Sequence, residues 1–236
     1  MRPRIWQHKP AQPLSARTVV AVEGLCLAGK TTLVHALAAR LGALVVPEYT
    51  DLAPLPPWPP YSREDVTAAL HHFLRLEQQR GIFAHRTPGR LVALDRSPLT
   101  LIAHEFGMVR LGVPAEPDLA VHLFSEAAER GLILTPDAYV YLRVPSSVRA
   151  VREARRGRLP AHLTNPVTQA GIEATDRTYL NALPPRRRVI LDGSASVADL
   201  TDAVARFVAN LPPAGEQPAP SWRVLAPPVA LARTDT

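Results

Sequence analysis

Cysteine, lysine and long apolar runs are all scarce in this sequence of 236 residues. The single cysteine, Cys26, excludes an internal disulfide and favours a reducing compartment. No apolar run approaches the roughly 20 residues that a helix needs to cross a bilayer. The charged first residues are not followed by the apolar region of a secretory signal. We therefore expect a soluble, cytoplasmic protein without a membrane span.

The scarcity of lysine also narrows the classes of nucleotide-binding protein to which the chain could belong. Of the 27 basic residues only Lys9 and Lys30 are lysines, which leaves 25 arginines. Neither lysine lies in an N-K-x-D motif, so the guanine recognition of switch GTPases is excluded. The net charge of +6 indicates a polyanionic partner, which is either a nucleic acid or a phosphorylated small ligand.

Two further kinds of site are missing from the sequence. His71 and His72 are adjacent and so face different sides of a helix, and no cysteines or acids cluster at ligand spacing. This pattern argues against a zinc ion held by the protein. No G-x-S-x-G motif and no Cys/His nucleophile are present, which argues against a hydrolase of those types.

Short apolar runs alternate with helical patterns along the chain. The runs expected to form strands are Thr18–Glu23, Ala43–Pro47, Leu91–Asp95, Ala138–Val144 and Arg188–Asp192. The segments expected to form helices are Lys30–Leu41, Arg63–Phe83, Pro98–Leu111, Pro117–Arg130, Ser146–Arg156, Asn165–Ala182 and Val197–Leu211. This alternation predicts an α/β fold with a five-stranded parallel sheet flanked by helices, and ligands at the carboxyl ends of the strands.

Proline-rich segments mark the limits of the predicted domain. We expect residues 1–17 and 211–236 to form tails and residues 18–210 to form one domain. A third proline-rich stretch, Pro54–Pro60, lies inside the domain. It either walls a ligand pocket or serves as a packed connector.

The first expected strand leads into EGLCLAGKTTL, which contains the motif G-x-x-x-x-G-K-T. The glycines let backbone N–H groups converge on phosphate oxygens, the lysine reaches the terminal phosphates, and the threonine binds Mg²⁺. The residues predicted to bind the nucleotide are Gly24, Leu25, Cys26, Leu27, Ala28, Gly29, Lys30, Thr31 and Thr32, with Thr31 also at the metal. Many ATPases, GTPases and kinases share such a loop, so the rest of the chain must decide the reaction.

The third expected strand ends in Asp95, which Arg96 follows. A carboxylate on a rigid strand is suited to organise Mg²⁺. The adjacent guanidinium can stabilise a transferred phosphoryl group or bind the phosphate of an acceptor. A structural ion pair at the strand end is the alternative interpretation.

The segment DRSPLTLIAHE resembles the D-R-Y/H-x-x-S-x-x-A-Y-Q motif of thymidylate kinases at Asp95, Arg96 and Ala103, with Thr100 in place of the serine. Its Arg-Ser pair also matches the E-R-S motif of deoxynucleoside kinases, and EGLCLAGKTTL resembles the phosphate loop of these kinases. The resemblance covers roughly residues 18–210. It implies a phosphate-loop NTPase fold, ATP as phosphoryl donor, Mg²⁺ as its counterion and, since related kinases are commonly dimers, a homodimer.

An arginine-rich segment follows the fourth expected strand. Arg149, Arg152 and Arg156 lie at i, i+3 and i+7, on one face of a helix. In the kinases that the chain resembles, a similar segment forms a lid over the ATP phosphates, here at about residues 145–160. A solvated basic face and a nucleic-acid patch are the alternatives, and the patch lacks interleaved aromatic residues.

Glu48 ends the second expected strand, in VVPEYTD. A glutamate at a similar place in deoxynucleoside kinases accepts the proton of the acceptor hydroxyl, and the resemblance implies the same role here. Asp51 or an ordinary strand-end carboxylate are the alternatives, and His104 and Glu105 depart from the thymidylate kinase motif. The helix expected next offers Phe73, Arg75, Gln78, Gln79 and Arg80 to hold the acceptor, and the spacing selects none of them.

These patterns together predict an ATP-dependent phosphotransferase whose acceptor is a nucleoside or a nucleoside monophosphate. The predicted catalytic residues are Lys30, Glu48, Asp95, Arg96, Arg152 and Arg156, with Arg149 at the nucleotide and Thr31 and Asp95 at the metal. A kinase of another small hydroxyl metabolite or antibiotic is the alternative. A nucleic-acid-binding NTPase is a third, less favoured hypothesis, and the identity of the acceptor stays open.

Overall fold

The computed structural model describes residues 17–57, 59–157, 159–212 and 221–226. In this part of the chain five strands form one parallel sheet in the order β2-β3-β1-β4-β5. The strands are β1 (Thr18–Glu23), β2 (Leu44–Val46), β3 (Leu91–Asp95), β4 (Ala138–Arg143) and β5 (Arg188–Asp192). The predicted α/β fold with a five-stranded parallel sheet is confirmed.

The central strand β1 shows why the strands of this sheet are apolar along their whole length. Val19 and Ala21 belong to the core cluster on one face of the sheet, whereas Val20 and Val22 belong to the cluster on the other face. Successive side chains of a strand point to opposite faces, so a sheet covered on both faces needs apolar residues at every position. The charged residue Glu23 comes only at the carboxyl end of the strand.

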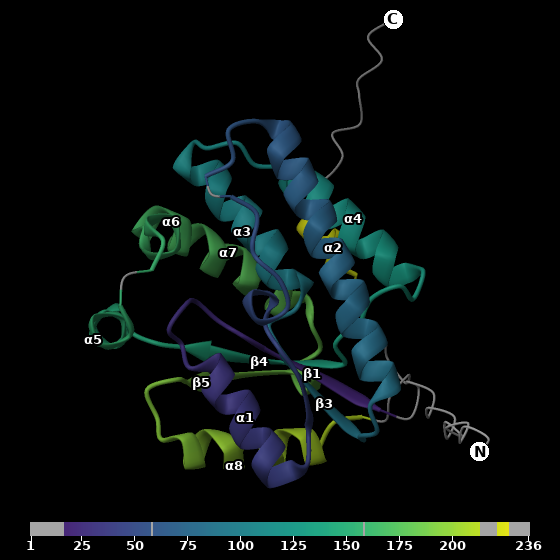
Figure 1. Ribbon diagram of the computed structural model, residues 1–236. Helices are drawn as coiled ribbons and strands as arrows, with labels where there is room; N and C mark the ends of the chain where they lie inside the picture. The colour runs from purple at the N-terminus through teal and green to yellow at the C-terminus, as the bar shows by residue number, and fades with distance from the viewer. Residues whose placement is uncertain (1–16, 58, 158, 213–220, 227–236) are drawn as a thin grey trace, which may run out of the picture.

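Helices cover both faces of the sheet (Figure 1). On one face lie α1 (Lys30–Leu41) and α8 (Val197–Ala209). On the other face lie α2 (Arg63–Arg86), α3 (Pro98–Leu111), α4 (Pro117–Glu129) and α7 (Pro166–Ala182). Two more helices, α5 (Ser146–Arg156) and α6 (Ala161–Thr164), lie to one side of the sheet. Three short 3₁₀ helices are η2 (Tyr49–Asp51), η3 (Pro185–Arg187) and η4 (Trp222–Leu225).

Local sequence signals explain where several helices begin and end. Ser62 caps α2 in a reciprocal capping box, and Ser97 and Asn165 cap α3 and α7 ahead of a proline in the first turn. Gly42 and Gly112 follow α1 and α3 with φ of 63° and 75°, a conformation that glycine adopts at little cost.

Every strand and helix predicted from the sequence is present, with ends that differ by at most about three residues. The helix α6 was not predicted, because its four residues are too few to show a helical period. None of the helices in the described ranges is both long and apolar enough to span a bilayer.

A segment near the C-terminus packs on the body of the protein. Trp222 of η4 is 2% exposed and belongs to the core cluster, and Arg223 forms an ion pair with Glu129 at 2.7 Å. The predicted tails, residues 1–17 and 211–236, lie mostly outside the described residues. The predicted domain limits therefore stay a prediction.

The helices α3 and α7 approach each other closely because each presents a glycine. A Cβ atom on Gly171 would lie 2.7 Å from the Cα atom of Gly107. A Cβ atom on Gly107 would lie 2.9 Å from the carbonyl oxygen of Thr168. Both distances are too short for real contacts, so a side chain at either glycine would push apart two helices that carry cavity residues such as Thr100 and Asp176.

Gly171→Ala should lower the free energy of unfolding by about 1–3 kcal/mol, because overpacking against backbone outweighs the gain in helix propensity. Thr178→Ala, on the exposed side of the same helix, is the control and should change this free energy by at most about 0.5 kcal/mol. Denaturant unfolding of both variants measures the difference. Equal stability of the two variants would show that the close approach does not matter.

Candidate active site

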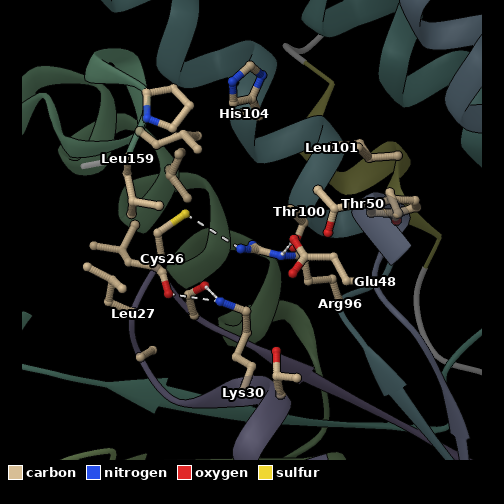
Figure 2. Close-up of a pocket in the computed structure, with 18 of the residues that line it drawn as sticks. Cys26, Leu27, Lys30, Glu48, Thr50, Arg96, Thr100, Leu101, His104 and Leu159 are labelled. Atoms are coloured by element: carbon tan, nitrogen blue, oxygen red, sulfur yellow. Dashed lines mark hydrogen bonds and ion pairs between the residues drawn. The ribbon is translucent and has the colours of Figure 1, made fainter. Parts of the chain in front are cut away.

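A cavity of about 920 Å³ opens at the carboxyl ends of the strands, where this class of fold binds its ligands. The volume lies in the range of roughly 300–1,000 Å³ that is typical of ligand sites. The walls come from the phosphate loop, the end of β2, α2, α3, the segment from α5 to α7 and the turn after β5. Figure 2 shows Arg96 in the middle of this space, with Cys26 on one side and Glu48 on the other.

The predicted phosphate loop forms one wall of the cavity. All the residues from Gly24 to Thr32 line the cavity. Gly24 has a φ of 135°, and a Cβ atom there would lie 2.5 Å from the carbonyl oxygen of Leu142, so only glycine fits. The Nζ atom of Lys30 donates to the carbonyl oxygens of Gly24 and Leu25, each at 2.8 Å. The lysine is therefore folded back onto its own loop.

Burial changes the pKa of Lys30. Lys30 is 4% exposed, and burial together with the neighbouring charge of Arg96 lowers its pKa to about 8. The phosphates of a nucleotide would supply the negative charge that such a buried ammonium group lacks. Lys30 is thus well placed to bind the terminal phosphates of a donor.

Arg96 connects the two halves of the cavity. Its Nε atom donates to Oε1 of Glu48 at 2.5 Å, and its Nη2 atom contacts Sγ of Cys26 at 3.5 Å (Figure 2). Burial acts to raise the pKa of Glu48, but the charges of Arg96 and Lys30 outweigh it, and the pKa is lowered. Glu48 is therefore ionised at neutral pH and able to accept a hydrogen bond from a hydroxyl group.

Glu23 was not among the predicted site residues, although it organises the neighbourhood of Arg96. Its carboxylate accepts hydrogen bonds from the backbone N–H of Ser97 at 2.8 Å and from the hydroxyls of Ser97 and Thr100 at 2.6 Å each. Burial raises the pKa of Glu23. These bonds fasten the end of β1 to the start of α3. The acid at the end of a buried strand was the available signal, but its partners lie 74 and 77 residues further along the chain.

Asp95, predicted to organise Mg²⁺, is buried at the carboxyl end of β3 and is not among the residues that line the cavity. It is 1% exposed, and its Oδ1 atom has no hydrogen-bond partner among the described residues. Buried polar atoms without a partner are rare, and Mg²⁺ with its bound water is a partner that suits a carboxylate. The described residues contain no group of three or more His, Cys, Asp or Glu side chains that could hold a metal ion alone. Mg²⁺ would therefore bind here together with the nucleotide, with the exposed Thr31 as a second candidate ligand.

Arg152 is the predicted lid arginine that reaches the phosphate loop. Its Nη1 atom donates to the carbonyl oxygens of Leu27 at 2.8 Å and Ala28 at 3.0 Å, and its Nη2 atom donates to that of Gly193 at 2.8 Å. The side chain thereby joins α5, the loop and the turn after β5. Its contacts go to backbone oxygens, which were not the partners predicted for it.

The other predicted lid arginines point elsewhere. Arg149 donates to Oε1 of Gln169 at 2.9 Å and lies 3.6 Å from Glu173, so the structure places it against α7. Arg156 lines the cavity with its neighbour Arg155, and both are exposed. No residue of α5 is fully buried, and the helix is held by these arginine contacts and by Val148, which packs against a core cluster. Residue 158 of the predicted lid lies outside the described residues.

The half of the cavity next to Glu48, which we call the acceptor half, is mostly apolar. It is lined by Tyr49, Leu70, Phe73, Leu101, Leu163 and Ile172. His104 of α3 and His162 of α6 also line it, with their rings edge to face at 5.5 Å. Burial and the neighbouring His104 lower the pKa of His162 to about 4, so this ring is neutral at neutral pH.

Cationic side chains are few in the acceptor half, whereas the carboxyl groups of Glu48, Asp65 and Glu105 line the cavity there. Arg96 is the only arginine among the described residues that line it from β2, α2, α3, α6 and α7 or their ends. Of the α2 residues considered from the sequence, Phe73 lines the cavity, whereas Arg80 reaches the carbonyl oxygens of Asp95 and Arg96. Asp176 of α7 lines the cavity and was not predicted, and burial raises its pKa well above the usual range, which favours the neutral acid.

The fold, in contrast to the sequence, has close counterparts among solved structures. No protein-family model and no curated protein sequence matches the chain. A deoxyadenosine kinase from M. mycoides superposes with a TM-score of 0.62 at 15% identity, over 82% of this chain and 100% of the other. A thymidylate kinase from Candida albicans superposes with a TM-score of 0.58 at 15% identity, over 82% of this chain and 92% of the other. The chain has the fold of these kinases. The fold that the motifs implied is thereby confirmed, and identities this low show the fold alone.

Arg152→Ala should raise the KM for ATP about tenfold, because losing charged hydrogen bonds to the phosphate loop loosens the donor site. Arg149→Ala removes an arginine from the same helix but no contact to the loop, and it should change this KM by less than about threefold. Steady-state kinetics with varied ATP measures both values. A larger effect from Arg149→Ala would contradict the arrangement described here.

Proposed function

We propose that this protein is an ATP-dependent phosphotransferase that transfers the γ-phosphoryl group of ATP to a hydroxyl group of a nucleoside. The observation that carries the proposal is the Glu48–Arg96 pair, which faces the phosphate loop inside one cavity. The fold shared with a deoxyadenosine kinase and a thymidylate kinase supports the same reaction. A homodimer stays a prediction.

The donor would lie along the phosphate loop. Backbone N–H groups between Gly24 and Thr32 would bind its phosphates, and Lys30 and Arg156 would offset their charge. Mg²⁺, when bound with the nucleotide, would offset the negative charge that develops on the phosphates. Thr31 would hold it directly, and the buried Asp95 would hold it through water.

The acceptor half favours a hydroxyl acceptor over a phosphate acceptor. A nucleoside monophosphate brings two negative charges, which need cationic partners in a mostly apolar site. Of the arginines that line the cavity in the described residues, Arg96 is already paired with Glu48, and the other three, Arg152, Arg155 and Arg156, come from α5, whose Arg152 binds the phosphate loop. An uncharged nucleoside needs only a hydrogen-bond acceptor at its hydroxyl and flat surfaces around its base, and Glu48 and Phe73 supply these.

The transfer then follows from the positions of the side chains. The acceptor oxygen forms a bond to the γ-phosphorus while the bond from phosphorus to the leaving oxygen of ADP breaks, and the hydroxyl proton passes to Glu48. Arg96 lies between Glu48 and Cys26 of the phosphate loop, so its charge stands where the transferred group passes. Because the transition state of such transfers is loose, positioning and charge contribute more than proton removal.

A kinase of another small hydroxyl compound, such as a sugar or an antibiotic, is the second candidate. The departures at His104 and Glu105 favour it, because both residues line the cavity from α3. The reaction and the roles of Glu48 and Arg96 would be the same in both cases. Only the acceptor would differ.

Glu48→Gln should lower kcat by roughly 100-fold or more, because the amide cannot accept the hydroxyl proton, while the KM for ATP stays nearly unchanged. Asp51→Asn is the control, because Asp51 is the neighbouring exposed carboxylate that the sequence left as an alternative. It should leave kcat within a few-fold of the wild-type value. If Asp51→Asn has the larger effect, Glu48 is not the residue that serves the acceptor.

A transfer screen with γ-labelled ATP and Mg²⁺ identifies the acceptor. It should include nucleosides, nucleoside monophosphates, sugars and hydroxylated antibiotics, with Lys30→Ala as the background control. Labelled nucleoside 5′-phosphate is the expected product. Preferred labelling of nucleoside monophosphates would contradict the choice of a hydroxyl acceptor, and labelling of a sugar or antibiotic alone would favour the second candidate.

A further inference from the structure

A buried ion pair of α2 touches the strand end from which Arg96 projects. The Nη1 atom of Arg80 donates to Oε1 of Glu77 at 2.5 Å, and both side chains are 0% exposed. The Nη2 atom of Arg80 donates to the carbonyl oxygens of Asp95 at 3.1 Å and Arg96 at 2.8 Å. Arg96 has a φ of 70°, a conformation that costs free energy for any residue but glycine. The guanidinium of Arg80 therefore holds a strained backbone in place.

Tyr49 connects the same ion pair to Glu48. Its hydroxyl donates to Oε1 of Glu77 at 2.5 Å, and its ring centre lies 4.8 Å from the guanidinium carbon of Arg80. Tyr49 is 3% exposed and directly follows Glu48 in the chain. Glu48 and Arg96 form the ion pair inside the cavity. A second, buried connection between them runs from Tyr49 through Glu77 and Arg80 to the backbone of Arg96.

We propose that Tyr49, Glu77 and Arg80 are positioning residues that fix Glu48 against Arg96 for phosphoryl transfer. The proposal rests on the proposed function of that pair. Glu77 and Arg80 are not among the described residues that line the cavity, so they act through the two residues they hold. The network reaches Arg96 through the hydrogen bond from Arg80 to its backbone carbonyl, and it reaches Glu48 through the peptide bond to Tyr49.

Stability alone is a poor explanation for this network. A buried ion pair often stabilises a fold no better than apolar residues of the same size would. Here the Nη2 atom of Arg80 donates to the carbonyl oxygens of two consecutive strand-end residues, and those residues carry the proposed chemistry. Tyr49 also packs edge to face on Phe73 at 5.4 Å, which links the wall of the acceptor half to the same network.

The kinetic test compares Tyr49→Phe, which removes only one hydroxyl, with Arg80→Met and Arg80→Lys. We expect kcat to fall about tenfold in Tyr49→Phe and about 100-fold in Arg80→Met, with the KM for ATP within about twofold of wild type. Arg80→Lys should recover part of kcat, because an ammonium group can still bind Glu77 and one carbonyl oxygen.

Tyr139→Phe is the matched control. It removes a hydroxyl of β4 that is as buried as that of Tyr49 and contacts Tyr179 at 3.4 Å, away from the Glu48–Arg96 pair. It should lower stability comparably and leave kcat unchanged. Equal kcat values in Tyr49→Phe, Tyr139→Phe and the wild type would overturn the proposal even if Arg80→Met fails to fold.

A second readout needs no substrate and follows the titration of Glu48 by carbon-13 NMR. Burial raises the pKa of Glu48, whereas the charges of Arg96, Lys30 and Arg156 lower it, and Arg96 has the largest lowering effect. Looser alignment of Arg96 should raise the pKa of Glu48 in Tyr49→Phe and Arg80→Met but not in Tyr139→Phe. An unchanged titration in both network variants would overturn the proposal. If the wild type transfers no phosphoryl group, that result contradicts the proposed function. The titration of Glu48 still tests whether the network positions the Glu48–Arg96 pair.

Discussion

The hydrogen-bonded ion pair between Glu48 and Arg96 is the interaction on which the site depends. It joins the end of β2 to the end of β3 across 48 residues of sequence, at the edge of the sheet where ligands bind. Arg96 can make it only because its backbone is held in the left-handed region. The carbonyl of Val22, the carboxylate of Glu23 and the guanidinium of Arg80 all bind backbone atoms at or next to Arg96, and so they fix the direction of its side chain.

The two halves of the cavity differ in chemistry in a way that suits a phosphotransferase. The donor half is built from backbone groups of the phosphate loop, Lys30 and exposed arginines of α5, which together suit a polyanion. The acceptor half is mostly apolar, with two imidazole rings and several carboxyl groups but few cations, and suits an uncharged compound with a flat ring. Arg96 stands where these halves meet, and its charge serves both.

The sequence predicted the parts of the structure that local pattern determines. Strand and helix limits follow from apolar period and capping residues, and the phosphate loop follows from fixed spacing, so Gly24–Thr32 line the cavity as expected. The sequence pattern could not predict which partner a side chain on a surface helix contacts. Arg149 and Arg152 share one face of α5, yet one binds α7 and the other binds the loop, since packing between distant elements decides the partner. The same holds for Arg80, which the sequence offered as an acceptor ligand and the structure turns toward β3.

The most direct test of this account is a structure with a compound in which the terminal phosphate of ATP is esterified to the 5′ oxygen of a nucleoside. The account predicts that the phosphates lie in the loop at Gly24–Thr32 and that the ester oxygen lies within hydrogen-bond distance of Glu48, with the nucleoside between α2 and α3. If the nucleoside instead lies outside the cavity while the phosphates occupy the loop, Glu48 and Arg96 do not serve an acceptor, and the central claim is wrong.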